Sequence, residues 1–277
     1  MRFSAAVTAA LIAANAMFAG FSVTAYAAED ELVYAALGDS IAYGYGLADR
    51  ERDAYPYITA EAIGADKFYD FTLCGAYTSD IIKMAENNAE ALAEADVISL
   101  TVGSNSLFVP FLVSAADMAG VEFPETEASA DKLEGAVDIS VILGLYRAYS
   151  NEKSPQRKQM DDAFAQFRKE WIELIDLISD INPNADIVVT GYYNPYRYWN
   201  IKPLNIEMGN IVEVYISKMN RFIEVSCRKK YRIADISKVM SDNIPDIRNP
   251  ANNRFDPHPD SRWQAYIAKA VISEIRG

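Results

Sequence analysis

Five short apolar runs alternate with longer segments of helical character, and this alternation limits the fold more than any other feature of the chain. The runs are four to six residues long and lie at 32–37, 68–72, 97–102, 187–190 and 233–236. Strands that alternate with helices along a chain usually pair in parallel, with helices covering both faces of the sheet. The pattern therefore predicts an α/β fold: a three-layer α/β/α sandwich around a mostly parallel five-stranded sheet, of the flavodoxin-like kind.

The segments between these runs carry the spacing of amphipathic helices. In the clearest of them, apolar side chains recur at steps of three and four from Met160 to Ile178. By such spacing and by end signals we predict helices near 55–63, 78–95, 107–118, 130–149, 160–178, 206–229 and 261–275. Residues 241–260 are predicted to form a loop. No linker composition or internal repeat divides the chain, so we expect one domain over 28–277, with 107–155 as either a lid-like insertion or core-packing helices.

The first 27 residues resemble an export signal. A positive start at Met1 and Arg2 precedes an apolar stretch over 5–23, and Ala25-Tyr26-Ala27 fits the small-x-small cleavage pattern. We therefore expect a signal peptide over 1–27 and a secreted, extracellular product; the alternative is an uncleaved membrane anchor. No later run of about 18 apolar residues occurs, so no integral membrane segment is expected after cleavage.

Charge and cysteine content exclude several classes of partner. The chain has 26 Lys and Arg against 39 Asp and Glu, a formal net charge of −13. Such a surface repels phosphate backbones, so nucleic acid is not an expected partner. Cys74 and Cys227 either pair or remain buried thiols, and with a single histidine so far away they cannot build a metal cluster. We expect no metal and no cofactor, and nothing indicates the oligomeric state.

In parallel sheets, functional sites form at the carboxyl ends of the strands, and a serine follows the first run there. Ser40 lies in Gly38-Asp39-Ser40, where it is expected close to free backbone N–H groups. A serine nucleophile needs a base, and His258 is the one imidazole in the chain. The neighbouring Asp256 is a carboxylate that could fix the tautomer of that imidazole and stabilise the imidazolium form.

Four short blocks together resemble the GDSL, or SGNH, serine hydrolases. The chain matches them in the expected order with Gly38-Asp39-Ser40, with Gly75 in Leu73-Cys74-Gly75-Ala76, with Gly103-Ser104-Asn105, and with Asp256-Pro257-His258 before the last helix. Tyr193-Asn194-Pro195-Tyr196 resembles the lipase- and esterase-like members more weakly. The likeness covers about 32–275, nearly the whole chain after the predicted signal peptide.

The resemblance implies a role for each matched residue. Ser40 would be the nucleophile, His258 the general base and acid, and Asp256 the carboxylate of the triad. The oxyanion hole would use the backbone N–H groups of Ser40 and Gly75 and the side-chain amide of Asn105, and donors fixed in advance suit such a site. The implied activity is that of a serine esterase, lipase or acylhydrolase, with a small-molecule or glycan ester as substrate.

Two positions depart from the family pattern. Ser106 stands where the third block usually has Asp, and Asp256 lies two residues before His258 instead of three. Both Asp256 and His258 precede proline, which favours extended backbone, and in extended backbone residues i and i+2 project to the same side. Asp256 could therefore still reach the imidazole; otherwise a Ser–His dyad, Asp260 or a distant carboxylate serves. A non-catalytic glycan-binding module on the same fold is the alternative function.

Aromatic residues gather near the expected site. Tyr193 and Tyr196 belong to a cluster after the fourth run and are candidate substrate-binding residues, with burial in a packed loop as the alternative. Tyr43 and Tyr45 follow the serine in a stretch with Gly44 and Gly46. The glycines indicate a turn, and the two tyrosines could shape the pocket.

Overall fold

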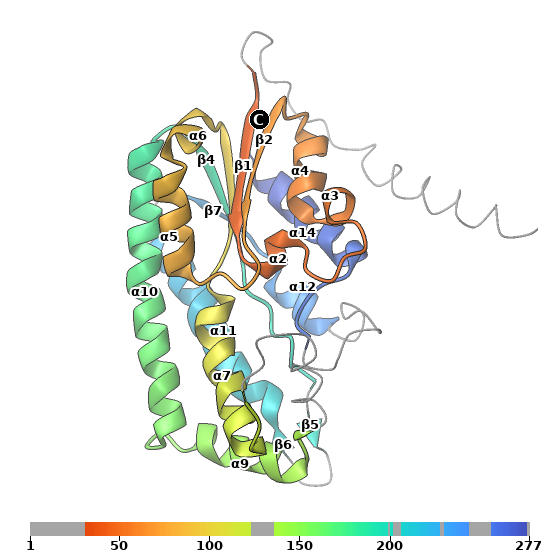
Figure 1. The fold of residues 1–277 in the computed structure, drawn as a ribbon, viewed down its shortest axis with the longest axis vertical. Coiled ribbons are helices and arrows are strands. Elements are labelled where there is room, and N and C mark those ends of the chain that lie inside the picture. Colours follow the sequence, from red (N-terminus) through yellow and green to blue (C-terminus); the bar gives the residue numbers. More distant parts are fainter. Residues whose placement is uncertain are drawn as a thin grey trace, which may run out of the picture.

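A five-stranded parallel sheet forms the centre of the protein (Figure 1). The computed structural model describes residues 31–122, 136–198, 200–201, 206–227, 230–243 and 256–275, so the predicted signal peptide lies outside the described residues. The strands follow the order β2-β1-β3-β4-β7 and all pair in parallel, which confirms the predicted fold class. Their bounds are Val33–Gly38 (β1), Lys67–Thr72 (β2), Val97–Thr101 (β3), Asp186–Thr190 (β4) and Arg232–Ala234 (β7).

The central strands are apolar because both of their faces are covered. Every residue of β1 and β3 is buried. One face lies under α5, α6 and α10, and the other under α4 and α14 (Figure 1). These helices span Tyr55–Ile63 (α4), Thr78–Asn87 (α5), Ala89–Glu94 (α6), Pro155–Ile181 (α10) and Ser261–Glu274 (α14). The arrangement is the predicted three-layer sandwich.

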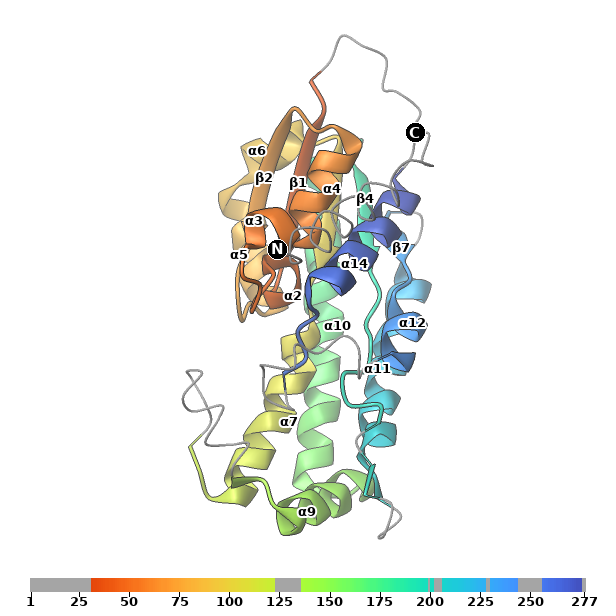
Figure 2. The same ribbon diagram turned by 90° about the vertical axis from the view of Figure 1, so that its right-hand side faces the viewer.

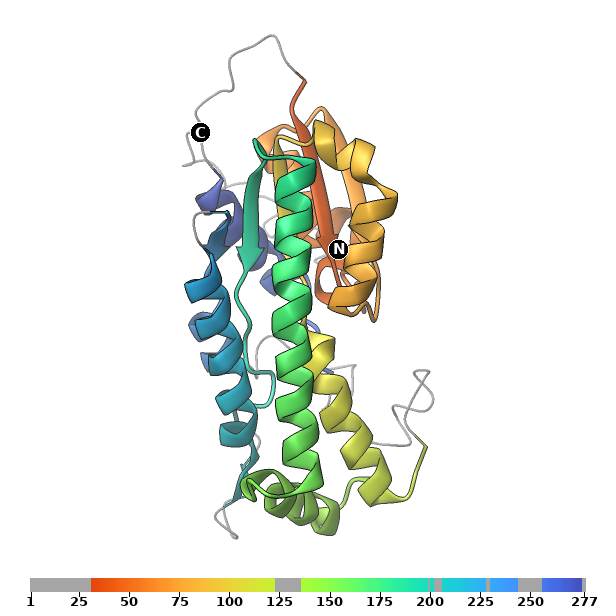
Figure 3. The same cartoon turned by 90° about the vertical axis from the view of Figure 1, so that its left-hand side faces the viewer.

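A group of helices extends beyond the carboxyl edge of the sheet. The 27-residue α10 is about 40 Å long at 1.5 Å per residue, far longer than the strands that it covers. The part of α10 that extends past the sheet lies beside α7, α9 and α11, as all three views show (Figures 1, 2 and 3). These helices span Ser104–Ala119 (α7), Ile139–Ser150 (α9) and Met208–Ser226 (α11).

This extension bears on the two interpretations of 107–155. Leu107 and Phe111 on α7 are buried, as are Leu145 and Tyr149 on α9, and all four belong to the main apolar cluster. The described part of the segment therefore packs as core helices, and residues 123–135 lie outside the described ranges.

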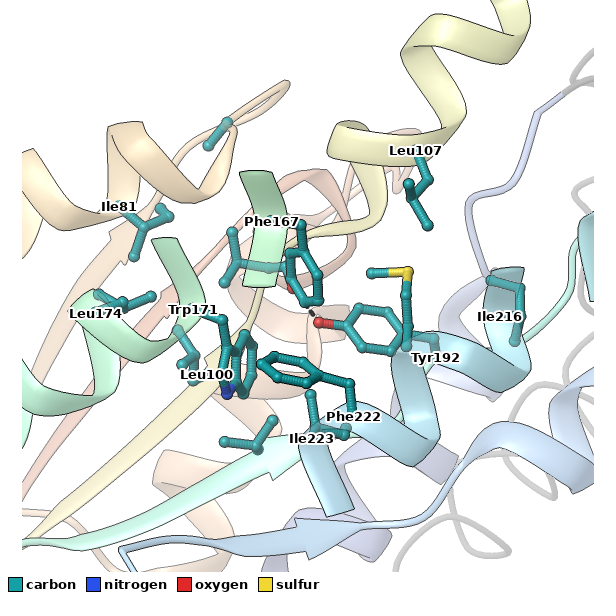
Figure 4. Packing of buried hydrophobic residues seen from close by; sticks show 14 of the residues in the cluster. Ile81, Leu100, Leu107, Phe167, Trp171, Leu174, Tyr192, Ile216, Phe222 and Ile223 are labelled. Atoms are coloured by element: carbon teal, nitrogen blue, oxygen red, sulfur yellow. Dashed lines mark hydrogen bonds between the residues drawn. The ribbon is translucent and has the colours of Figure 1, made fainter. Parts of the chain in front are cut away.

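Aromatic rings from α10, from α11 and from the loop after β4 pack together close to the end of β3 (Figure 4). The Phe167 ring centroid lies 5.7 Å from that of Trp171 and 6.0 Å from that of Phe222. The Tyr192 hydroxyl donates to the carbonyl of Val102 at 2.7 Å. A Cβ on Gly103 would stand 2.4 Å from the Phe167 ring, and the φ of Gly103 is +110°, so only glycine fits where the chain turns into α7.

Some short helices and strands are not predicted by the sequence patterns. The predicted helix over 78–95 is two helices, separated at Asn88, which has a non-helical φ of −123°. No helix is predicted at α2 (Ser40–Tyr43), α3 (Arg50–Asp53) or α12 (Ser237–Asp242), and the last two residues of α12 fall within the predicted loop over 241–260. No strand is predicted at β5 (Asn200–Ile201) or β6 (Ile206–Glu207), which pair antiparallel. Elements of two to six residues are too short to show a period.

No helix within the described ranges combines the length and the hydropathy that a membrane span requires.

Candidate active site

Ser40 lies at the carboxyl edge of the sheet, as the first residue of α2. Strand β1 ends at Gly38, which pairs with Thr72 on one side and Thr101 on the other. The side chain of Asp39 then accepts a hydrogen bond from the backbone N–H of Ile41 at 3.0 Å and caps α2. A first helical residue has no intrahelical acceptor for its N–H, so the Ser40 amide is available to a ligand.

The structure brings His258 and Asp256 to Ser40 from the other end of the chain. The Nε2 atom of His258 lies 2.8 Å from Ser40 Oγ, and the Nδ1 atom lies 2.5 Å from Asp256 Oδ1. The three side chains thus form one continuous hydrogen-bonded series from carboxylate to imidazole to hydroxyl.

Asp256 reaches the imidazole from only two residues away because it closes a local turn. The same Oδ1 atom also accepts the backbone N–H of His258 at 2.9 Å, an Asx-type turn. One oxygen therefore fixes both the backbone and the ring of His258. Asp260 is engaged elsewhere: it accepts the N–H of Trp263 at 3.1 Å and caps α14.

A buried glutamine that the sequence interpretation missed joins α14 to the serine side of the site. Gln264 is fully buried, its Oε1 accepts the N–H of Tyr55 at 3.0 Å, and its Nε2 donates to the carbonyl of Ile41 at 2.9 Å. It therefore connects the helix after His258 to the residue after Ser40. The available signal was a glutamine within the apolar stripe that continues through Ile267 and Ala268.

The two loops expected to complete an oxyanion hole are joined to each other. The side-chain amide of Asn105, in the first turn of α7, donates to the carbonyl of Ala76 at 2.9 Å. Ala76 directly follows Gly75, whose φ is +78°. The N–H of Leu73 donates to the carbonyl of Gly38 at 2.8 Å, so the loop with Gly75 is also held to the end of β1.

Ser106, where the family usually has Asp, is buried in the first turn of α7. Its backbone N–H donates to the carbonyl of Gly103 at 3.1 Å. A small neutral side chain in a buried position needs no counter-charge, so the replacement is compatible with the local packing.

Burial favours the packed-loop interpretation for the two tyrosines predicted to bind substrate. Tyr196 is 2% exposed, and its ring lies 5.8 Å from that of Phe108 and 6.2 Å from that of Phe111. Tyr193 is also buried, and its hydroxyl donates to the carbonyl of Pro257. Tyr193 therefore holds the loop of His258, and neither ring offers an open face to a substrate.

Asp39 is a second carboxyl group beside the site. It is fully buried, and the burial raises its pKa to about 7, against the lowering effects of the Ile41 N–H bond and the charge of His258. Its Oδ2 atom has no hydrogen-bond partner among the residues that the structure describes. The loss of solvation explains the direction of the shift, because a buried carboxylate is less stable than a buried carboxylic acid.

The loop with Gly75 exposes apolar side chains at the edge of the site. Leu73 is 44% exposed and Tyr77 is 38% exposed. Cys74, between them and also exposed, is a free thiol, as is Cys227, so the two cysteines are not paired. In the described part of the chain, no group of three or more His, Cys, Asp or Glu side chains could hold a metal ion.

Several solved structures share this fold. Phospholipase A1 from Streptomyces albidoflavus superposes with a TM-score of 0.59 at 18% identity, over 89% of this chain and 100% of that chain. An extracellular lipase from Streptomyces rimosus gives 0.59 at 16% identity, over 88% and 100%. A protein of the G-D-S-L family from Desulfitobacterium hafniense gives 0.51 at 12% identity, over 88% and 99%.

Sequence comparison adds nothing to these likenesses, since no family model and no curated protein matches the chain. At identities below 20%, the structures establish how the chain is folded. The strand order, the place of Ser40 after β1 and these neighbours agree: the chain has the fold of the GDSL, or SGNH, hydrolases.

Proposed function

We propose that the protein is a serine ester hydrolase of the GDSL type, with Ser40 as nucleophile, His258 as general base and Asp256 as the third member of a triad. The observation that carries the proposal is the hydrogen-bonded series Asp256–His258–Ser40, with 2.5 Å at the first link and 2.8 Å at the second. The second distance lies within the reach required for proton transfer from Ser40 to His258, and the first link orients the imidazole.

Each proton and bond in the reaction has a place at these atoms. Ser40 Oγ attacks the carbonyl carbon of the ester while its proton passes to Nε2 of His258. The bond to the alcohol oxygen then breaks, and the imidazolium returns the proton to that oxygen. Water, deprotonated by the same nitrogen, then attacks the carbonyl carbon of the acyl-Ser40 ester. The bond from that carbon to Ser40 Oγ breaks, Nε2 returns the proton to Oγ, and the carboxylic acid is released. Asp256, bonded to Nδ1, keeps the imidazole in the tautomer that leaves Nε2 able to accept.

The tetrahedral intermediate needs donors that are already oriented. The proposed donors are the N–H of Ser40, the N–H of Gly75 and the amide of Asn105. An amide nitrogen carries two hydrogens, so the bond of Asn105 to the carbonyl of Ala76 fixes the orientation of the group and leaves its second hydrogen for the oxyanion.

We further propose that the substrate ester has an apolar part that lies against Leu73 and Tyr77. These exposed side chains flank Gly75, the residue expected at the carbonyl oxygen. Short acyl esters and lipid esters fit such an edge better than an acetylated glycan. The names of two structures with the same fold, a phospholipase A1 and an extracellular lipase, are compatible with this choice.

Hydrolysis of p-nitrophenyl esters by the Ser40→Ala variant tests the function. We expect the wild-type protein to turn over short-chain esters and Ser40→Ala to lose at least about 10³-fold in kcat, since removal of a triad nucleophile can cost up to about 10⁶-fold. Ser273→Ala, an exposed serine near the end of α14, is the matched control and should keep full activity. Folded wild-type protein without esterase activity on any ester would instead favour a glycan-binding module.

We also propose export of the protein, supported by the sequence over 1–27. Expression in a host with a general secretory pathway, followed by N-terminal sequencing of the product from the medium, should give a chain that begins at residue 28. Full-length protein retained in the membrane fraction would contradict cleavage.

A further inference from the structure

The turn after Ser40 brings the backbone of Tyr45 close to the proposed nucleophile. Helix α2 ends at Tyr43 and is followed by Gly44, whose φ is +78° and where a Cβ would stand 2.7 Å from that of Ala54. Beyond this reversal, the backbone N–H of Tyr45 donates to the carbonyl of Ser40 at 3.0 Å. The position of Tyr45 is therefore fixed relative to the backbone of the serine itself.

The side chain of Tyr45 lies against the imidazole of His258. The two ring centroids are 4.6 Å apart and the ring planes are tilted by 47°. This distance is at the close end of the range for interacting aromatic pairs. The His258 side chain is 15% exposed, and the Tyr45 ring is one of the groups that lie against it.

Three other groups interact with the same imidazole, by hydrogen bonds or by charge, whereas Tyr45 contacts it through an aromatic ring. Asp256 holds Nδ1 and Ser40 faces Nε2, both in the hydrogen-bonded series through the ring, while Asp39 acts through its charge from the turn after β1. Both hydrogen bonds act near the plane of the ring, so they restrain motion within that plane more than motion out of it. A ring packed against its face opposes that motion.

We propose that Tyr45 is a positioning residue, whose aromatic ring holds the imidazole of His258 in line with Ser40 Oγ. The inference rests on the proposed function and deepens it. When His258 takes the proton of Ser40 it becomes a cation, and the face of an aromatic ring also attracts cations. The turn thus supports both partners of the proton transfer: its backbone holds the serine and its side chain holds the base.

Two variants separate the ring of Tyr45 from its hydroxyl and its bulk. Tyr45→Phe keeps the ring, whereas Tyr45→Leu keeps an apolar side chain without aromatic character. We expect Tyr45→Phe to retain kcat within about threefold of wild type. Tyr45→Leu should lose about 10- to 100-fold in kcat with KM changed less than about threefold, because misplacement of a base slows the chemical step and leaves ground-state binding intact.

A second readout does not depend on activity. His258 is the one histidine of the chain, so protein produced without a polyhistidine tag and labelled with ¹³C,¹⁵N-histidine gives a single set of imidazole NMR signals. We expect these signals to carry a ring-current shift from Tyr45 that persists in Tyr45→Phe and disappears in Tyr45→Leu. The imidazole signals of Tyr45→Leu should also broaden or average as the ring gains freedom.

The outcomes distinguish this inference from the proposed function. Unchanged kcat and unchanged imidazole signals in Tyr45→Leu would overturn the role of Tyr45, as would an equal loss of kcat in Tyr45→Phe or a loss that appears in KM alone. If Ser40→Ala retains activity, the proposed hydrolase mechanism fails, while the NMR comparison still reports whether Tyr45 restrains the imidazole.

Discussion

At the scale of single residues, two carboxyl groups close to Ser40 and His258 lie in different environments. Asp256 is bonded to both the ring and the backbone of His258, whereas Asp39 is fully buried with one oxygen unpartnered among the described residues. In the proposed mechanism, Asp256 orients the general base directly. Asp39 caps α2 and places a buried titratable group next to the nucleophile.

Replacement of Asp256 by Asn should lower kcat by about 10³- to 10⁴-fold, because the amide can donate to Nδ1 and thereby favour the wrong imidazole tautomer. Ester hydrolysis at saturating substrate measures the effect. The control is Asp260→Asn, since Asn caps a helix as well as Asp does, and this variant should keep its activity. A larger loss in Asp260→Asn than in Asp256→Asn would mean that Asp260 serves the histidine.

Asp39→Asn should change the pH dependence of stability. The pKa of Asp39 is about 7 in the folded protein against 3.8 without the fold, so the unfolded chain releases this proton first. The raised pKa of Asp39 means that its contribution to the free energy of unfolding is fully present below about pH 4, where the carboxyl group is protonated in both states. As the pH rises through about 7 this contribution is lost, and the free energy of unfolding falls by up to about 4 kcal/mol.

Urea unfolding at pH 4 and at pH 8 tests this assignment. The free energy of unfolding should fall more between the two pH values in wild-type protein than in Asp39→Asn, which keeps a capping oxygen but has no charge. Equal falls in the two proteins would show that Asp39 does not titrate in this range.

At the scale of elements, one helix joins the two ends of the chain that supply the proposed triad. Gln264 on α14 bonds the N–H of Tyr55 and the carbonyl of Ile41. Gln264→Leu would leave both backbone groups buried without a partner, at about 1–3 kcal/mol for each group. We expect urea unfolding to show a loss of about 2–5 kcal/mol, and less than 0.5 kcal/mol for the exposed control Gln166→Leu, by the usual small effect of surface changes.

The loop after β2 should decide the preference for acyl length. Leu73→Ser and Tyr77→Ser remove exposed apolar surface beside Gly75. Each should raise KM several-fold for p-nitrophenyl butyrate or octanoate and leave p-nitrophenyl acetate nearly unchanged, because only the longer chains reach that surface. Ile172→Ser, which removes an equally exposed apolar side chain from α10, is the control. A uniform change across all chain lengths would argue against contact with the acyl group.

At the scale of the whole molecule, the sheet could be predicted from sequence because each strand is a separate apolar run followed by a helix. The strand order then placed Ser40, Gly75 and Asn105 at one edge, and the position of Asp256 two residues before His258 proved sufficient for contact. The reason lies in an Asx turn, a local feature that a pattern of extended backbone does not contain.

What could not be predicted depends on contacts between distant residues. The bond of Gln264 to Ile41 spans 223 positions, and the contact of Tyr45 with His258 spans nearly as many. No local sequence pattern encodes contacts between residues so far apart in the chain. The sequence left two interpretations open for the tyrosines after β4 for the same reason, because whether an aromatic side chain binds a ligand or packs in the core depends on neighbours such as Phe108 and Phe111.

The central claim is that His258 activates Ser40 as a nucleophile, and covalent labelling tests it most directly. Wild-type protein treated with a fluorophosphonate should gain one phosphonyl group, and peptide mass spectrometry should place it on Ser40. His258→Ala, with Ser40 intact and the fold verified by circular dichroism, should react far more slowly. Folded wild-type protein that carries no adduct on Ser40, or a His258→Ala variant labelled as fast as wild type, would contradict the account.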